Sequence, residues 1–376
     1  MRYTLDSRAV RPGMGFVALK GEKVDGRDFI PQALAAGAAD VITGLDELHA
    51  RARERRRALR AKVVGLTGSA GKTTTKEFLK AFLGCYGTEG NYNNHIGLPL
   101  TILNCPDDAE FLVLEMGTNH PGEIAALCDI AEPDDGVIAS IGTAHIEFFG
   151  TQEGIAEEKG ALFAATRDFN VVSSACNQLG ILRRLSRPRL VEVDVSSGGL
   201  ECPLPGAHNL SNMMIAYATA RELGVPHETC AARLSDFSLP GARWRVSEKW
   251  GATFIDDTYN ANPDSMIAAL DAFAATPCDG RRIAVLGDMF ELGASSQELH
   301  RKVFAHAMAL GIPLVIGVGE QSSQCLCHLV YKTVAELKKK FRVDVSAGDL
   351  VLLKASHGMR LGELIADGGP AEGGES

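Results

Sequence analysis

The chain has 376 residues, is 45% hydrophobic and carries a formal net charge of −9 at pH 7. This length suggests two or three domains, and the hydrophobic content is enough to bury cores, so a disordered chain is not the default expectation. The negative charge argues against a nucleic-acid-binding surface, and no apolar run approaches the ~18 residues of a membrane span. The first residues lack the apolar core of a signal peptide, and nine scattered cysteines indicate reduced thiols. We therefore expect a cytoplasmic protein with no nucleic acid partner and no membrane insertion.

Residues 1–61 predict a small α/β domain, with strands at 16–19 and 40–42 and a helix at 29–36. Residues 45–62 have helical propensity and contain six arginines. No aromatic residues are interleaved with these arginines as stacking platforms for bases. A solvated helix that links two domains is therefore favoured, and an RNA-binding arm stays the alternative.

The stretch 63–77 predicts a phosphate-binding loop. An apolar strand pattern is followed by Gly-Ser-Ala-Gly-Lys-Thr at 68–73 and then by a helix-compatible run. Glycines let backbone N–H groups converge on phosphate oxygens, Lys72 supplies a positive charge, and the Thr73 hydroxyl can reach a metal ion. Leu66 occupies the place of the first glycine in the usual longer pattern, so the loop fits a shorter form. A structural turn is the alternative.

Residues 62–240 alternate between strand and helix patterns, which indicates a central domain with a parallel sheet. Predicted strands at 111–115 and 137–141 end at Glu115 and close to His145. Ligands of such sheets bind beyond the carboxyl ends of the strands, so the phosphate loop, Glu115 and His145 are expected at one edge. A carboxylate suits magnesium, whereas His145, taken alone, is better explained as a structural histidine.

Residues 241–366 predict a third, Rossmann-like domain, and 367–376 predict a disordered tail. The expected fold is therefore α/β with three domains. Cys-Leu-Cys-His at 325–328 lacks a second pair of metal ligands, so a metal site there is disfavoured. The third domain should contain strands at 282–288, 313–317 and 349–356, and a helix at 296–310 whose Leu299, Val303 and Phe304 share one face.

Seven motifs occur in order along the chain. They are Gly-Ser-Ala-Gly-Lys-Thr-Thr-Thr-Lys-Glu at 68–77, Asn-Tyr-Asn-Asn-His-Ile-Gly-Leu-Pro-Leu-Thr at 91–101, Glu-Met-Gly-Thr-Asn-His-Pro-Gly-Glu-Ile at 115–124, Ile-Gly-Thr-Ala-His-Ile-Glu at 141–147, Gly-Ala-His-Asn-Leu-Ser-Asn at 206–212, Asp-Asp-Thr-Tyr-Asn-Ala-Asn-Pro-Asp-Ser-Met at 256–266 and Leu-Gly-Asp-Met-Phe-Glu-Leu-Gly at 286–293. This series resembles the Mur ligase family. The last two motifs are most similar to members that join D-alanyl-D-alanine to UDP-N-acetylmuramoyl-tripeptide.

The resemblance implies an ATP-dependent ligase that uses Mg²⁺, forms an acyl phosphate intermediate and acts as a monomer in peptidoglycan precursor synthesis. By the same resemblance, residues 1–61 would be a truncated UDP-substrate-binding domain, 62–240 the ATP-binding domain and 241–366 the C-terminal domain.

The resemblance also implies roles for individual residues. The phosphate loop would comprise Gly68, Ser69, Ala70, Gly71, Lys72, Thr73 and Thr74, and the metal ligands would be Thr73, Glu115, His145 and Lys159, the last as a carbamate. The other nucleotide contacts would be His208, Asn209, Arg243 and Asp257. The substrate contacts would be Asp6, Ser7, Arg8, Asn93, Asn94, Asn260 and Asn262.

The chain also departs from the family pattern. The first domain and the stretches 171–205 and 318–348 look shortened, His357 stands where an arginine is usual, and Arg245 is a second candidate for the role of Arg243. Another Mur-type amino-acid ligase and a non-catalytic nucleotide-binding relative are the alternatives. The Asp-Asn-Pro-Arg motif of the ligase that adds a diamino acid is not found. Folylpolyglutamate synthase shares the loop but not Tyr-Asn-Ala-Asn-Pro, and a generic kinase does not explain Lys159.

Overall fold

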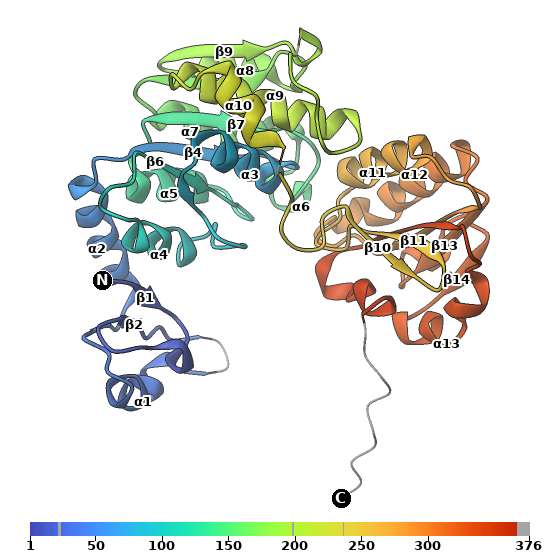
Figure 1. The fold of residues 1–376 in the computed structure, drawn as a ribbon, viewed down its shortest axis with the longest axis horizontal. Coiled ribbons are helices and arrows are strands. Elements are labelled where there is room, and N and C mark those ends of the chain that lie inside the picture. Colours follow the sequence, from blue (N-terminus) through green and yellow to red (C-terminus); the bar gives the residue numbers. More distant parts are fainter. Residues whose placement is uncertain (22–23, 198, 236, 367–376) are drawn as a thin grey trace, which may run out of the picture. The chain divides into compact units, whose positions relative to one another are not determined.

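The structure is a computed structural model, drawn as a ribbon in Figure 1. It describes residues 1–21, 24–197, 199–235 and 237–366, so the predicted tail lies outside the described residues. The contacts divide the chain into two compact units. Unit 1 comprises Met1–Gly142, Phe148–Pro203 and Asn209–Phe237, and unit 2 comprises Thr143–Glu147, Leu204–His208 and the described residues from Ser238 onward.

The beginning of unit 1 forms a small parallel sheet in the order β1-β2-β3. Its core is correspondingly small and is built around the buried residues Val10, Phe16, Ala18 and Ala33. The strand predicted at 40–42 is confirmed, whereas the one predicted at 16–19 ends two residues earlier. The elements are β1 (Tyr3–Thr4), η1 (Ser7–Ala9), β2 (Gly15–Val17), η2 (Gly26–Phe29), α1 (Ile30–Ala35) and β3 (Asp40–Ile42).

The larger sheet of unit 1 is entirely parallel, in the order β5-β6-β4-β7-β8-β9. Its central strands β4, β6, β7 and β8 are almost completely buried, which explains their continuous apolar runs. The predicted strand at 111–115 is confirmed, while the next begins and ends earlier than predicted. The strands are β4 (Lys62–Thr67), β5 (Tyr86–Gly87), β6 (Phe111–Glu115), β7 (Asp135–Ile138), β8 (Phe169–Ser173) and β9 (Arg189–Val193).

Helices connect these strands, as parallel pairing requires. Helix α3 packs against α10, and α7 packs against both α5 and α8. The helices are α2 (Leu45–Ala58), α3 (Lys72–Leu83), α4 (Gly97–Asn104), α5 (Glu123–Ala131), α6 (Ile146–Phe149), α7 (Gln152–Ala165), α8 (Leu179–Leu185), η3 (Val195–Ser197), α9 (Ala207–Glu222) and α10 (His227–Leu234).

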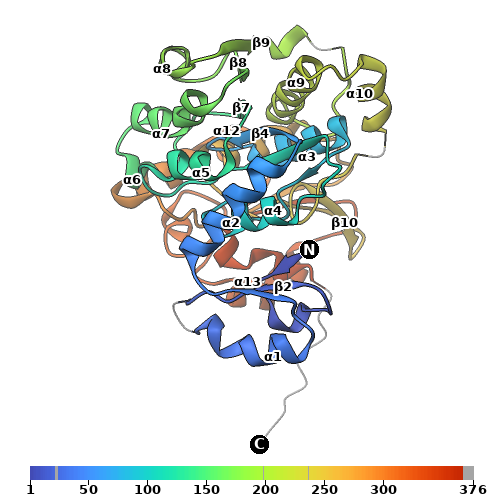
Figure 2. The same cartoon turned by 90° about the vertical axis from the view of Figure 1, so that its left-hand side faces the viewer.

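The arginine-rich helix α2 is not simply solvated, because it packs against α4 and α5 (Figure 2). Arg56 is buried and donates to the carbonyl oxygens of Ala131 and Glu132 and to the carboxylate of Asp134. Arg53, Arg55 and Arg57 also bond residues beyond their own helix, at the C-terminal ends of α4 and α5. The last carbonyls of a helix lack partners within that helix, so Arg53, Arg55 and Arg56 satisfy them, while Arg57 donates to the side-chain carboxylate of Glu132.

Unit 2 contains one six-stranded sheet in the order β10-β11-β15-β12-β13-β14, parallel except for the pair β10 and β11. Successive strand residues face opposite sides, so Ala284 and Leu286 belong to one core cluster and Ile283 and Val285 to the other. The strands are β10 (Arg245–Lys249), β11 (Ala252–Asp256), β12 (Arg282–Gly287), β13 (Leu314–Val318), β14 (Leu329–Tyr331) and β15 (Leu350–Lys354).

Helices cover both faces of this sheet, with α11 and α12 on one side and α13 on the other (Figure 1). The shared apolar face predicted for 296–310 is confirmed, because Leu299, Val303 and Phe304 all join the cluster under α12. The predicted α/β fold class agrees with the architecture of both units. The helices are α11 (Pro263–Ala275), η4 (Gly293–Ser295), α12 (Ser296–Ala309), η5 (Ser322–Gln324), α13 (Val334–Asp344), η6 (His357–Met359) and η7 (Leu361–Leu364).

Within the described ranges, every helix is too short or too polar to span a bilayer.

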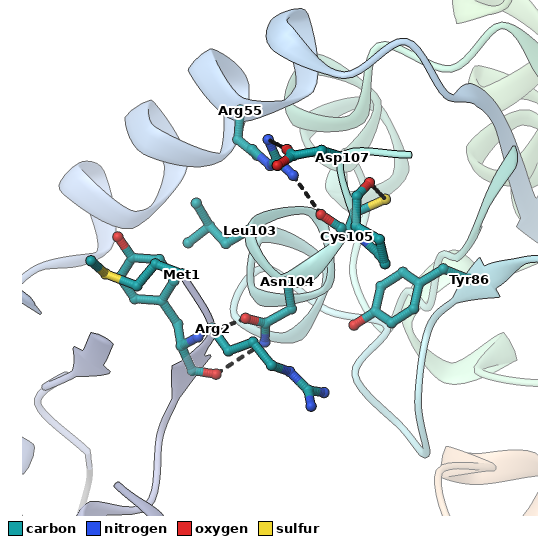
Figure 3. A pocket seen from close by; sticks show the side chains of 10 residues that line it. Met1, Arg2, Arg55, Tyr86, Leu103, Asn104, Cys105 and Asp107 are labelled. Carbon is teal, nitrogen blue, oxygen red and sulfur yellow. Dashed lines mark hydrogen bonds and ion pairs between the residues drawn. The ribbon is translucent and has the colours of Figure 1, made fainter. Parts of the chain in front are cut away.

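A pocket of about 610 Å³ lies in unit 1 where β1 meets α4 (Figure 3). The side-chain amide of Asn104, at the end of α4, is bonded to β1: it accepts from the backbone N–H of Tyr3 and donates to the carbonyl of the same residue. The pocket lies beside the starts of β5 and β6, at the edge opposite the phosphate loop that follows β4. Its lining residues are Met1, Arg2, Tyr3, Arg55, Tyr86, Leu103, Asn104, Cys105, Pro106 and Asp107.

Candidate active site

The phosphate loop connects β4 to α3 at the carboxyl edge of the larger sheet. Gly71 is the N-cap of α3 and has φ of 78°, a conformation that favours glycine. A Cβ atom at this position would lie 2.3 Å from Asn212 Oδ1, so α9 leaves no room for a side chain. Lys72 Nζ donates to the carbonyl of Gly68 at 2.7 Å, which folds its side chain back over the loop.

The loop is braced by the segment that follows β7. The backbone N–H groups of Ser69 and Ala70 donate to the carbonyl and the hydroxyl oxygen of Ser140, and Gly142 N donates to Ser69 Oγ. Two loop N–H groups are thereby engaged. An anion bound here would therefore be met by the first-turn N–H groups of α3, where the helix dipole also favours negative charge.

Glu115 ends β6, is 2% exposed and lies beside the start of α3. It accepts from Thr73 Oγ1 at 3.0 Å and from Asn93 Nδ2 at 2.9 Å, and Lys76 Nζ lies 3.2 Å from its Oε2 atom. Burial acts to raise the pKa of Glu115, but the charges of Lys76 and Lys72 and the Asn93 hydrogen bond lower it below its usual value. The carboxylate is therefore held ionised although it is buried.

Lys159 lies on α7, is 1% exposed, and its Nζ atom has no hydrogen-bond partner among the described residues. Burial lowers the pKa of this amine well below its ordinary value, and the charge of Lys72 lowers it further against an opposing effect of Glu158. Glu158 itself accepts from the N–H groups of Gly122 and Ile124 at the start of α5, which fixes α7 against that helix. Lys72 thus interacts electrostatically with both Glu115 and Lys159.

His145 belongs to the short segment Thr143–Glu147, which clusters with unit 2. It has a left-handed backbone with φ of 61°, and its Nδ1 atom lies 2.7 Å from Glu291 Oε2. The predicted convergence is therefore seen for the phosphate loop and Glu115 within unit 1, while the proposed role of His145 stays a prediction.

The predicted nucleotide residues of unit 2 lie around the loop between β11 and α11. Asp257 Oδ2 lies 2.6 Å from the buried ammonium group of Lys354, the last residue of the neighbouring strand β15. Burial lowers the pKa of His208 against the opposing charge of Asp257. Arg243 stacks on the ring of Tyr259. Asn209 is buried on α9 and belongs to unit 1.

Several predicted substrate residues have local structural roles. Asn262 caps α11 in a capping box with Ser265, and Asn94 Oδ1 accepts from two N–H groups at the start of α4. The Asn260 side chain accepts from the N–H of the residue that follows it.

The predicted uridine-nucleotide residues lie on η1 of the small sheet. Asp6 caps this turn and pairs with Arg8, whose hydrogen bonds lower the pKa of Asp6 to about 2. Ser7 donates to Gln32 Oε1.

Three residues that the sequence analysis did not single out hold candidate residues in place: Lys76 and Ser140 in unit 1, and Lys354 in unit 2. Lys76 follows Lys72 by one helical turn, so its position on the same face of α3 could have been read from the spacing. The other two depend on which strands are neighbours. Within the described residues, no group of three His, Cys, Asp or Glu side chains could hold a metal ion, the 325–328 cluster included.

The chain matches three family descriptions in succession. They are the Mur ligase family catalytic domain at residues 2–71, the Mur ligase middle domain at 66–189 and the Mur ligase glutamate ligase domain at 242–357.

Curated relatives share the length of the chain. UDP-N-acetylmuramoyl-tripeptide–D-alanyl-D-alanine ligase of Bacillus subtilis is 32% identical over 421 residues, which cover 96% of this chain and 92% of the relative. The protein of the same name from Synechocystis is 34% identical and covers 96% and 90%.

Two solved structures have the same fold. MurF from Acinetobacter baumannii superposes with a TM-score of 0.85 at 28% identity and covers 97% of this chain and 92% of its own. MurF ligase from Thermotoga maritima, in complex with ADP, has a TM-score of 0.83 at 31% identity and covers 97% and 96%. These similarities extend over 96–97% of the chain. The chain belongs to the Mur ligase family.

Proposed function

We propose that this chain joins D-alanyl-D-alanine to UDP-N-acetylmuramoyl-tripeptide and converts ATP to ADP and phosphate. The observation that carries the proposal is the contact between Thr73 of the phosphate loop and the buried Glu115 carboxylate, in a chain about one-third identical to ligases of that name. The reaction requires ATP because a carboxylate does not react with an amine until one of its oxygens becomes a leaving group. Phosphoryl transfer from ATP to the tripeptide carboxylate supplies that leaving group.

The chain's own groups would act on this transfer in a defined way. The first-turn N–H groups of α3 would receive the phosphate oxygens, with Ser69, Ala70, Gly71 and Thr74 shaping the turn around them. Lys72, released from the Gly68 carbonyl, would place its charge on the terminal phosphates. The amine of D-alanyl-D-alanine would then attack the acyl phosphate carbon, and phosphate would leave as the amide forms.

The donor atoms at this edge fit a magnesium ion. Thr73 Oγ1 and Glu115 Oε2 lie 3.0 Å apart, and hard cations prefer such oxygens. We infer that these two groups, His145 and a carbamate on Lys159 would hold Mg²⁺. When bound, the ion would offset negative charge on the transferring phosphoryl group.

The environment of Lys159 suits carbamate formation. Its unpartnered, buried amine has a depressed pKa, so its lone pair is available to attack the carbon of CO₂. One amine proton leaves as the N–C bond forms, and the neutral amine becomes an anionic oxygen donor. An ammonium group would instead repel the metal ion.

The remaining contacts follow the family roles. His208, Asn209, Arg243 and Asp257 would bind the adenosine part of ATP. The muramoyl and dipeptide substrates would meet Asn93, Asn94, Asn260 and Asn262, and the uridine nucleotide would meet Asp6, Ser7 and Arg8. The proposed domain division is 1–61, 62–240 and 241–366. We further propose that the chain acts as a cytoplasmic monomer.

The test is phosphate release by the purified chain with ATP, Mg²⁺, UDP-N-acetylmuramoyl-tripeptide and D-alanyl-D-alanine, with each substrate omitted in turn. Release that requires both peptide substrates, with formation of the ligated product, supports the proposal. Release only with UDP-N-acetylmuramoyl-dipeptide and a diamino acid would assign another Mur ligase activity. Nucleotide binding with no ligation of any substrate pair would identify a non-catalytic relative.

A further inference from the structure

Within unit 2, the segment that leads into β10 is fastened to the loop that follows β11. Tyr259 N donates to the carbonyl oxygen of Ala242 at 3.1 Å. Trp244 N donates to Asp257 Oδ1 at 3.3 Å. These bonds join backbone on either side of Arg243 to the loop, so the position of the arginine backbone depends on the loop.

The Arg243 side chain is held by the same loop. Its guanidinium carbon lies 3.4 Å from the centroid of the Tyr259 ring, which places the planar cation on the aromatic face. Such stacking is attractive because the face of an aromatic ring is electronegative, and the flat guanidinium group can lie parallel to it. The Tyr259 hydroxyl has no hydrogen bond among the described residues, so the ring face is the part that acts on Arg243.

The loop is itself fixed from the neighbouring strand. Lys354 Nζ lies 2.6 Å from Asp257 Oδ2 and donates to the carbonyl oxygen of Asn260 at 3.0 Å. The buried ammonium group of Lys354 therefore bonds residues that precede and follow Tyr259 in the chain. Beyond the ring, the imidazole of His357 lies 6.0 Å away between centroids. The ring is thus confined by Lys354 through its backbone, by Arg243 on its face and by His357.

We propose that Tyr259 is a positioning residue that orients Arg243 for the nucleotide. This inference rests on the proposed function, in which Arg243 contacts bound ATP. A guanidinium group held flat on a ring loses little rotational freedom when it meets a phosphate or ribose oxygen. Removal of the ring should therefore weaken nucleotide binding more than it lowers kcat.

The experiment compares Tyr259→Leu, Tyr259→Phe and the matched control Tyr331→Leu, which removes a ring from the edge strand β14 of the same sheet. Steady-state phosphate release gives KM for ATP and kcat, and calorimetric titration with ADP gives the affinity directly. Tyr259→Leu should raise KM for ATP and the Kd for ADP roughly three- to thirtyfold, the range of a cation–π contact, while kcat changes less. Tyr259→Phe restores the ring and should restore both values, and Tyr331→Leu should leave them near wild type.

A double-mutant cycle with Arg243→Lys separates positioning from a merely structural role. Lysine keeps the charge but not the planar group, so it should resemble Tyr259→Leu, and the double variant should be little worse than either. Additive losses, or equal KM values for Tyr259→Leu and wild type, would overturn the inference. If the wild-type chain releases no phosphate, the proposed ligase function is wrong, which is a different outcome. The ADP titration would still test Tyr259 in that case, since it requires no turnover.

Discussion

Lys76 Nζ lies 3.2 Å from Glu115 Oε2, and both side chains are almost completely buried. The ammonium group also lies 3.3 Å from Glu77 and donates to the carbonyl of Gly90. One lysine thus joins α3, the end of β6 and the loop before α4. A buried ion pair of this kind stabilises only as a pair, because either partner alone is a buried charge without compensation.

Lys76→Met should therefore destabilise unit 1 by about 3 kcal/mol, measured by urea unfolding. Adding Glu115→Gln to Lys76→Met removes the carboxylate that has lost its partner, so the double variant should recover part of this stability. It should be inactive, because Glu115 is a proposed Mg²⁺ ligand. If the double variant were less stable than Lys76→Met alone, the pairing would not be the cause of the destabilisation.

Lys159 predicts opposite effects on stability and activity. Its amine has a lowered pKa in the folded chain, so the unfolded chain binds this proton more strongly and burial of the group costs stability. This cost is present below the pKa that Lys159 has in the unfolded chain, and it disappears as the pH rises above that pKa. Lys159→Met removes the cost and should raise the midpoint of thermal unfolding at pH 7.

The same variant cannot form the proposed carbamate. Phosphate release should fall at least about a hundredfold, because loss of a partner that only orients a metal ligand already costs about 10- to 100-fold. Wild-type activity should also decline when CO₂ is removed and return when bicarbonate is added. ¹³C-bicarbonate should give a carbamate resonance that Lys159→Met lacks. Wild-type activity that is indifferent to CO₂ would contradict the carbamate.

Gly71→Ala should weaken ATP binding for a steric reason. The new Cβ would lie 2.3 Å from Asn212 Oδ1, and φ of 78° is already unfavourable for alanine. Gly122→Ala is the matched control, because Gly122 also caps a helix with φ of 89° but has nothing within 4 Å of its Cβ position. Both variants should lose about 1 kcal/mol of stability from backbone strain. Only Gly71→Ala should raise the Kd for ATP, by tenfold or more.

The sequence was sufficient for elements that are local. The phosphate loop, the strand that ends on Glu115 and the apolar face of α12 each depend on consecutive or helically spaced residues, so their types and spacing predict them. The roles implied by the Mur family resemblance likewise depend on short motifs. Local motifs therefore identified the candidate site before any tertiary contact was known.

Contacts across strands could not be predicted in this way. Ser140 braces the phosphate loop because β7 lies beside β4, and Lys354 reaches Asp257 because β15 lies beside β11. Strand order is a tertiary property that strand patterns do not encode. The interpretation of α2 as a solvated helix failed for a related reason: its arginines bond carbonyls of α5 that are 75 residues away in the chain.

Arg56 and Arg57 offer a direct test of that correction. Arg56 is buried and bonds three acceptors. Arg57 has a side chain that is 66% exposed, and among the described residues it pairs with Glu132 alone. Arg56→Met should lower the free energy of unfolding by about 3 kcal/mol, since buried carbonyls and the Asp134 carboxylate lose the hydrogen bonds that Arg56 donates. Arg57→Met should lower it by less than about 1 kcal/mol. Equal losses by chemical unfolding would mean that α2 is held by its apolar face alone.

Asp135, at the start of β7, should make stability depend on pH. It is fully buried, both carboxylate oxygens lack hydrogen-bond partners among the described residues, and Lys62 Nζ lies 3.5 Å away. Burial raises the pKa of Asp135 to about 7 against the opposing charge of Lys62, with Asp168 and Asp134 adding to the rise. The folded chain therefore keeps a proton that the unfolded chain releases near pH 4. Stability should fall as pH rises from about 4 to 7 and then level off.

Asp135→Asn removes the charged form, so the fall between pH 4 and 7 should become shallower and stability at pH 8 should rise by about 2 kcal/mol. Asp168→Asn is the control, since its side chain is 51% exposed and also pairs with Lys62. The control should change stability by less than about 1 kcal/mol, as expected for an exposed pair. Urea unfolding of both variants at several pH values measures the slopes. Parallel pH profiles for wild type and Asp135→Asn would show that this carboxylate is ionised in the folded chain, and that Lys62 outweighs its burial.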